Sequence, residues 1–307
     1  MSVFKKVRLQ LFKSYNPGTV LWKTFYPWRH FKFKTDLIRT FGYLFSRDIQ
    51  YFGEFGYELI AVVPYAYWLH KRNKLNATKS FKDTQCLYYF SENHIEMNRN
   101  RRHWLLDDFP LGNIHVTQLD TSQWYPPPYK RHYANERFKW EKPSCVICNK
   151  YTIEWKGPPI NFLSLETLSK LFKILKEKYK IIYNRPTSKN IVSDDQEELI
   201  LRDMEFIEKE HPEIITIQDL AENNKDLSFN ELQMMVYANC DRFISVQGGS
   251  SILTSYFGGK NIIFAKRGSE LEHDSYKWYA KLSGSKIYHV DDYSRLLAVV
   301  EKEFLRP

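Results

Sequence analysis

The stretch FISVQGGSSILTSYF, residues 243–257, decides the fold class because it places a short apolar strand, a glycine-rich loop and a helical segment in immediate succession. A strand that runs through a tight loop into a helix is the building unit of parallel α/β sheets. The same alternation continues on both sides of this stretch from residue 144 onward. The second half of the chain is therefore predicted to be a doubly wound parallel sheet.

Strands are predicted in this half at residues 145–148, 180–184, 214–218, 243–247, 261–265 and 286–290. Helices are predicted between them at residues 165–179, 193–210, 228–239, 251–257, 273–282 and 293–304. Ser193 before two aspartates, and Ser228 with Glu231 three residues later, are typical helix starts.

The first half gives a weaker pattern of the same kind. A strand is predicted at residues 48–52, followed by a glycine loop and an apolar helix to about residue 71, with further strands at 85–90 and 114–118 on either side of the polar segment 93–102. The proline-rich stretch 124–129 and the charged residues 130–142 are typical of a connection between domains. We therefore expect a basic aromatic segment at 1–47, an α/β domain at 48–140 and a Rossmann-like domain at 141–307, the two domains facing a cleft.

Composition excludes several classes of protein. In 307 residues, 43% hydrophobic and 16% aromatic content excludes intrinsic disorder. The longest nearly apolar run, residues 59–69, contains Pro64 and is shorter than the roughly 20 residues of a membrane span. The first fifteen residues scatter charges among apolar side chains, unlike a signal peptide. A cytoplasmic location is expected, and peripheral attachment to the membrane is the alternative.

Four cysteines are too few for a disulfide framework in a chain of this length, so reduced thiols are expected. Cys145 and Cys148 form a CxxC motif without a second pair or a nearby histidine, which favours a buried strand over a zinc site.

The positive charge is concentrated at the start of the chain. Residues 1–50 hold ten Lys or Arg against two Asp, whereas the whole chain carries a net charge of +9. The same residues include twelve aromatics, a mixture suited to the interface of an anionic membrane. Packing of these aromatics on the main domain is an equal alternative, and a dimer contact is another. The near-neutral remainder argues against a nucleic-acid partner.

Candidate site residues follow the predicted strands, since ligands of open α/β sheets bind beyond the carboxyl ends of their strands. The first loop, Gly53-Glu54-Phe55-Gly56-Tyr57-Glu58, offers Glu54 and Glu58 as bases that remove a proton from a hydroxyl. An ordinary tight turn with a glutamate at a helix start is the alternative for either residue.

Lys150 and Arg185 follow two neighbouring strands and are candidates for binding a phosphate, Arg185 with the two-pronged geometry of a guanidinium. A surface ion pair is the alternative for each.

The loop Gln247-Gly248-Gly249-Ser250-Ser251 offers backbone amides and hydroxyls that suit a phosphate or a sugar ring, although a serine-capped turn has the same composition. A polar loop at residues 266–274 follows the next strand, and Glu270 within it is a candidate for contacts to a nucleotide or sugar. No DxD, HExxH or GxSxG pattern occurs in the sequence, so no essential metal, no cofactor and no serine-hydrolase chemistry are expected.

This combination resembles the two-domain GT-B glycosyltransferases, and within them the fucosyltransferase-like group, over residues 48–305. The segment 52–59 is similar to that group's glycine-rich first loop, with Tyr57-Glu58 in place of Asn-Gln. Asn184-Arg185-Pro186, or Asn149-Lys150-Tyr151, is similar in placement to the HxRxGD strand end. Residues 246–251 with 256–258 resemble the later loop in which serines contact the donor phosphates.

The resemblance implies transfer of a sugar from a nucleotide-sugar, bound by the second domain, to a glycan or lipid-linked acceptor held by the first. Glu54 or Glu58 would deprotonate the acceptor, and Arg185, Lys150 and the amides of residues 248–251 would stabilise the leaving phosphate. A metal-independent, inverting reaction in surface polysaccharide or glycoconjugate synthesis is expected, with a retaining reaction as the alternative. The alternatives are a sugar-nucleotide epimerase or pyruvyl transferase of the same fold, and a non-catalytic peripheral membrane protein.

Overall fold

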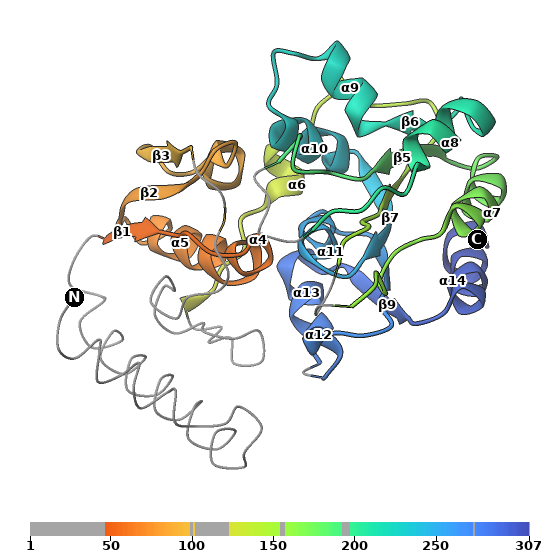
Figure 1. The fold of residues 1–307 in the computed structure, drawn as a ribbon. Coiled ribbons are helices and arrows are strands. Elements are labelled where there is room, and N and C mark those ends of the chain that lie inside the picture. The colour runs from red at the N-terminus through yellow and green to blue at the C-terminus, as the bar shows by residue number, and fades with distance from the viewer. Residues whose placement is uncertain are drawn as a thin grey trace.

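The computed structural model describes residues 47–98, 101, 123–153, 157–191, 197–272 and 274–306, which form two parallel β-sheets with helices around them (Figure 1). The predicted basic aromatic segment lies outside these residues except for Arg47. None of the helices in the described ranges has the length and apolar character needed to cross a membrane.

The second domain contains a six-stranded sheet in which all neighbouring strands are parallel, in the order β6-β5-β4-β7-β8-β9. Its strands are β4 (Ser144–Cys148), β5 (Lys180–Asn184), β6 (Ile215–Thr216), β7 (Cys240–Val246), β8 (Lys260–Phe264) and β9 (Lys286–Val290). Its helical elements are α7 (Leu165–Leu175), α8 (Asp203–Glu210), α9 (Ile217–Asn223), α10 (Phe229–Ala238), α11 (Gly249–Ser255), α12 (Ser269–Glu272), α13 (Tyr276–Ser283), α14 (Tyr293–Val300) and the π-helical turn η6 (Glu301–Leu305).

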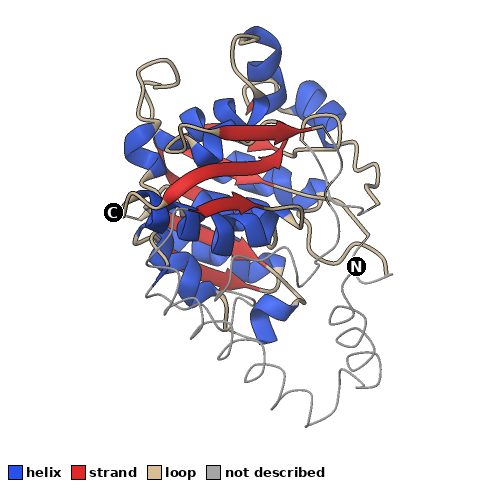
Figure 2. Cartoon of the chain, turned by 90° about the vertical axis from the view of Figure 1, so that its left-hand side faces the viewer, coloured by secondary structure: helices blue, strands red, loops and turns tan. Residues whose placement is uncertain are grey.

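Both faces of this sheet are buried under helices, as Figure 2 shows. Alternate residues of β4 enter different apolar clusters: Val146 and Cys148 belong to one, Cys145 and Ile147 to the other. This period of two is what a strand covered on both faces requires. All four cysteines of the chain are free and buried, and Cys145 and Cys148 lie in a buried strand as predicted.

The first domain has a three-stranded parallel sheet, β1 (Arg47–Gln50), β2 (Leu75–Phe81) and β3 (His94–Met97), in that order. The remaining helical elements of the described chain are α4 (Phe55–Tyr57), η2 (Glu58–Val62), α5 (Val63–His70), the 3-10 turn η3 (Gln85–Tyr88) and α6 (Tyr129–His132). Elements α4, η2 and α5 follow one another directly, and Leu59 to Leu69 is buried throughout. The predicted strand, loop and apolar helix at the start of this domain are confirmed.

The two domains are packed directly on one another. Helix α11 contacts α4 and η2, and α6 contacts α10. The Tyr256 hydroxyl donates to the Leu59 carbonyl at 2.5 Å. Asp83 accepts from the Asn230 backbone N–H at 2.9 Å, and one apolar cluster continues through both domains. The expected boundary near residue 140 falls between β3, the last described strand of the first sheet, and β4 of the second.

The predictions for the first domain are wrong at residues 85–90, where a 3-10 turn replaces the expected strand. The Glu96 carboxylate accepts from the backbone amides of Thr84 and Gln85 at 2.8 and 2.9 Å, which fixes a helical turn at that point. Strands β2 and β3 were not predicted, and the expected strand at 114–118 lies outside the described residues.

Two boundaries in the second domain also differ. The helix start expected at Ser193 lies outside the described residues. Of the described part of the helix expected at 193–210, residues 197–202 are not helical and α8 begins at Asp203, because Glu198 pairs with Thr152 and Arg202 has a φ of 57° that a helix interior does not admit. The strand expected at 214–218 is limited to Ile215–Thr216, because the Thr216 hydroxyl accepts from the Asp219 amide and caps α9. Helix α9 itself was not predicted.

Candidate functional site

The sheet of the second domain has a topological switch point between β4 and β7. From β4 the chain adds β5 and β6 on one side, then returns to place β7 on the other side of β4. At such a point the following loops diverge and leave a crevice at the carboxyl edge of the sheet. The loops after β4 and β7 contain Lys150 and Gly248, which the sequence predicted as phosphate-binding residues.

The structure brings these two loops together. Cys148 pairs with Asn184 of β5 and with Ser245 of β7, so the three strands leave the sheet at the same level. The Lys150 ammonium nitrogen lies 3.5 Å from the position that a Cβ would take at Gly248, whose φ is 129°. A cation therefore lies directly over a glycine that any side chain would strain.

Asn149, which is buried, fixes the loop that carries Lys150. Its side-chain oxygen accepts from the backbone amides of Lys150 at 2.9 Å and Leu163 at 2.8 Å. Its amide nitrogen donates to the Leu163 carbonyl at 3.0 Å and to the Tyr183 hydroxyl at 3.1 Å. The backbone at Lys150 is thus held by contacts to two other segments.

The loop after β7 offers backbone amides more than hydroxyls. The Ser251 side chain is fully buried, and its hydroxyl donates to the Gly248 carbonyl at 2.7 Å. Ser250 is half-buried. The amides of Gly249 and Ser250 make no hydrogen bond to the described part of the chain, whereas those of Ser251 and Ile252 donate to Gly248. Among the groups of this loop predicted to contact the donor, the backbone amides of Gly249 and Ser250 are therefore the best suited to bind a phosphate.

Arg185 follows β5 with its guanidinium held on one side. Its Nε donates to the buried Asp203 carboxylate at 2.6 Å, and the Tyr183 hydroxyl donates to the same oxygen. Within the described ranges its two terminal nitrogens donate to no residue. Burial, followed by the charge of Asp203, raises the pKa of Tyr183 well above its ordinary value, so this hydroxyl stays a donor. Asp203 was not predicted as a site residue.

Gln247 and Glu270 form one connected group. The Gln247 amide donates to the Glu270 carboxylate at 2.6 Å, and its oxygen accepts from the Tyr276 hydroxyl at 3.3 Å. A Cβ at Gly268 would lie 1.8 Å from the Gln247 amide nitrogen, so only glycine allows this approach. Gln247 is buried and Glu270 half-buried, which makes Gln247 the support and Glu270 the group that faces outward.

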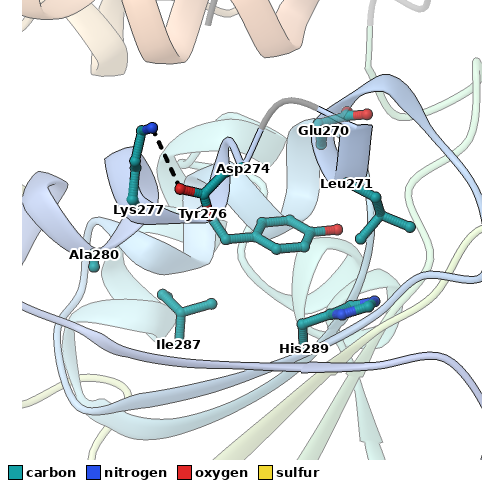
Figure 3. A pocket seen from close by; sticks show the side chains of 8 residues that line it. All are labelled: Glu270, Leu271, Asp274, Tyr276, Lys277, Ala280, Ile287 and His289. Carbon is teal, nitrogen blue, oxygen red and sulfur yellow. Dashed lines mark ion pairs between the residues drawn. The ribbon is translucent and has the colours of Figure 1, made fainter. Parts of the chain in front are cut away.

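A cavity of about 430 Å³ opens beside Glu270 between α12, α13 and β9 (Figure 3). Leu271, Ala280 and Ile287 give it apolar walls, and the ring of Tyr276 lies across it toward Leu271 and His289. The further lining residues are Asp274 and Lys277, which form an ion pair at 3.3 Å. The cavity combines a flat ring, apolar walls and carboxylates at its rim, and sequence reasoning did not locate it.

The first loop of the chain lies against this site from the other domain. A Cβ at Gly249 would lie 2.6 Å from Cδ1 of Phe55, and one at Gly56 would lie 3.4 Å from Cδ1 of Ile252. The predicted loops at residues 53–58 and 247–251 are thus in contact across the interface. Glu54, adjacent to Phe55, is half-buried and is the N-cap residue of helix α4.

Glu58, the second predicted base, is fully buried. One of its oxygens lies 2.6 Å from Nη2 of Arg101, and the other accepts from the hydroxyls of Ser80 and Tyr88, the latter at 2.9 Å. Burial, followed by the charge of Glu58, raises the pKa of Tyr88 well above its ordinary value. A carboxylate enclosed by these donors is not accessible to an acceptor hydroxyl, whereas the side chain of Glu54 is half-buried.

Within the described ranges, no group of three or more His, Cys, Asp or Glu side chains is placed to hold a metal ion. The absence of an essential metal stays a prediction.

No protein-family model matches the chain, and no curated protein matches it in sequence. Among solved structures it is similar to the ADP-heptose LPS heptosyltransferase II of E. coli, with a TM-score of 0.54, 9% identity, and coverage of 85% of this chain and 98% of that one. A glycosyl transferase family 9 protein from Veillonella parvula DSM 2008 matches with a TM-score of 0.38, 10% identity, and coverage of 79% and 63%. The likeness does not single out the fucosyltransferase-like group. The chain has the α/β architecture of two Rossmann-like domains that GT-B glycosyltransferases share.

Proposed function

We propose that the chain is a glycosyltransferase that moves a sugar from a nucleotide-sugar donor to a glycan or lipid-linked acceptor. The observation that carries the proposal is the Lys150 ammonium over Gly248 at the switch point of the second sheet. This point is where open α/β sheets bind ligands, and a cation beside amides that donate to no described residue suits a phosphate group. The choice of glycosyl transfer as the reaction is supported by the GT-B architecture.

In this proposal the donor diphosphate binds at the loops after β4, β5 and β7. Lys150 and the amides of Gly249 and Ser250 contact it from one side, and the terminal nitrogens of Arg185 from the other. Asp203 holds the Arg185 guanidinium in one orientation, which lowers the entropy lost when the ligand binds. The nucleoside enters the cavity beside Glu270, where a carboxylate accepts from sugar hydroxyls and Tyr276 lies beside the base.

The reaction is a direct displacement with inversion at the anomeric carbon. The acceptor oxygen forms a bond to that carbon while the bond from the carbon to the leaving phosphate oxygen breaks. Glu54 takes the proton of the acceptor hydroxyl, and Lys150 and Arg185 stabilise the charge that builds on the phosphate. Because these two cations are supplied by the protein, the reaction proceeds without a metal ion.

The acceptor approaches from the first domain, and residues 1–47 bring the enzyme to an anionic membrane surface. Twelve aromatics and ten cations within residues 1–50 give the composition of an interfacial anchor. The protein acts on the cytoplasmic side in surface polysaccharide or glycoconjugate synthesis.

The test is a thermal-shift and calorimetry screen against nucleoside diphosphates and their sugar conjugates with EDTA present. A ligand at a hundred times its Kd stabilises the native state by about 2.7 kcal/mol. We expect one nucleotide family to raise the Tm, and Lys150→Met to weaken its binding about 10- to 100-fold, as loss of a charged hydrogen bond predicts. The control is Lys170→Met, which removes an exposed lysine paired with Glu166 on α7. No stabilisation of the folded protein by any nucleotide would overturn the proposal.

A further inference from the structure

Arg101 is a buried cation that contacts the first loop at its beginning, its middle and its end. Its side chain is 2% exposed. Nη1 donates to the Gly53 carbonyl at 3.2 Å, the guanidinium lies 5.0 Å from the centre of the Phe55 ring, and Nη2 lies 2.6 Å from the Glu58 carboxylate. One side chain therefore spans the six residues of the loop.

The contacts are those of an enclosed ion pair and not of a surface one. The centre of the Phe81 ring also lies 4.4 Å from the guanidinium carbon. Ser80 and Tyr88 donate to the second oxygen of Glu58. Removing one partner of such a pair leaves a buried charge without compensation, so the pair resists opening.

The conformation held in this way determines where Glu54 lies. The Tyr51 hydroxyl donates to the Glu54 carbonyl at 2.9 Å, and the Glu58 amide donates to the same carbonyl at 3.1 Å. Phe55 is pressed against Gly249 of the opposite domain. Because Phe55 contacts both Arg101 and Gly249, the residue next to Glu54 is held against the loop after β7.

We propose that Arg101 and Glu58 are positioning residues, which hold the first loop so that the Glu54 carboxylate faces the donor phosphates across the domain interface. This inference rests on the proposed function, in which Glu54 is the base. Arg101 touches neither substrate, and its effect passes entirely through the loop. Misplacement of a catalytic group by about 1 Å can cost on the order of 100-fold in rate.

The experiment combines hydrogen exchange with kinetics on the full chain. In Arg101→Lys we expect the amides of residues 53–58 to exchange at least about tenfold faster, while those of β7 and β8 are unchanged. The kcat for transfer should fall about 10- to 100-fold, with the KM for the donor within about threefold of wild type. The control is Arg137→Lys, an exposed arginine paired with Asp226, which should change neither quantity.

A second variant separates positioning from folding. Arg101→Met with Glu58→Gln removes both charges, so we expect its Tm to lie above that of Arg101→Met alone while its kcat stays low. Recovery of kcat together with Tm would overturn the proposal, as would unchanged exchange in residues 53–58. A third outcome is that the wild-type chain binds nucleotide but transfers no sugar, while exchange in Arg101→Lys is still faster. This result would overturn the proposed function, but it would still show that Arg101 holds the first loop.

Discussion

Two strand–loop–helix units face each other in this molecule, and they are supported in different ways. The first runs from β1 through residues 53–58 into α4, and the second runs from β7 through residues 247–251 into α11. Each loop has two glycines, and the loops touch where Phe55 meets Gly249. The first carries carboxylates, whereas the second lies beneath a lysine.

The loop after β7 is supported by the helix it leads into and by the next strand. Ser251 donates to the Gly248 carbonyl at 2.7 Å, and Asn261 of β8 donates to the Ser251 carbonyl at 3.2 Å. The first loop depends instead on Arg101, which lies 48 positions from the Gly53 carbonyl it contacts. Two loops of the same local form can therefore be held by contacts at very different distances along the chain.

The largest effect is expected where the first loop performs chemistry. Glu54→Gln removes the proposed base but keeps the size of the side chain, so we expect kcat to fall by about 10²- to 10⁴-fold. Nucleotide binding should be unchanged, because the donor site belongs to the other loop. Steady-state kinetics and calorimetry on one preparation check both statements, and a loss of nucleotide affinity equal to the loss of rate would contradict the division of roles.

Arg185→Met is the matching change on the donor side. Loss of a charged hydrogen bond costs roughly 1.5–3 kcal/mol, so we expect nucleoside diphosphate binding to weaken by one to two orders of magnitude. Asp203→Asn keeps the guanidinium but loosens its orientation, and should have a smaller effect in the same direction. Calorimetry on wild type, Arg185→Met and Asp203→Asn measures the three affinities for a nucleoside diphosphate. Equal affinities would show that Arg185 does not contact the diphosphate.

The fold of the second domain was predictable because its strands are buried on both faces. Such strands are short apolar runs, and β4, β5, β7, β8 and β9 lie within three residues of their predicted starts. The first domain offers no such pattern: β2 has the sequence LNATKSF and β3 HIEM, and eight of their eleven residues are not buried. The apolar run at residues 85–90 forms a turn because of the Glu96 carboxylate, which no local pattern indicates.

The positions of candidate site residues were predictable where topology alone determines them. Lys150, Arg185 and Gly248 follow strands, and parallel strands end at one edge of the sheet. Arg101 was missed because it lies in the basic stretch NRNRRHW, where only the tertiary structure distinguishes it from its neighbours. Asp203 was missed because it was placed inside a predicted helix that in fact begins there.

Contact between the loops can be broken at Gly249. In Gly249→Ala the new Cβ would lie 2.6 Å from Phe55, closer than real contacts allow, and overpacking of this kind costs about 1–3 kcal/mol. We expect a lower free energy of unfolding and a reduced kcat. Adding Phe55→Leu should recover part of the stability, as measured by urea denaturation. A double variant no more stable than the single one would show that the two loops do not press on each other.

The smallest expected effect is a loss of stability at low pH, and it should be confined to the first loop. His94 of β3 stacks on Tyr88, which donates to Glu58, and burial lowers the pKa of His94 while Glu96 and Glu58 oppose this shift. The folded state therefore binds the proton less readily than the unfolded chain, so the free energy of unfolding is at its full value above about pH 6.5 and declines as the pH falls toward the folded pKa.

The hydrogen bonds of His94 agree with a neutral ring. Thr84 donates its hydroxyl proton to the Phe81 carbonyl, so the His94 Nε2, 3.0 Å from that hydroxyl, is the protonated nitrogen, and Nδ1 accepts from Thr78 at 2.7 Å. His94→Gln keeps one donor and one acceptor but does not titrate, so its stability should change less than that of wild type between pH 7.5 and 5.5. Hydrogen exchange should show the acid response of wild type in residues 53–58 and not in 247–251. An equal response in the two loops would mean that the first loop does not depend on this distant network.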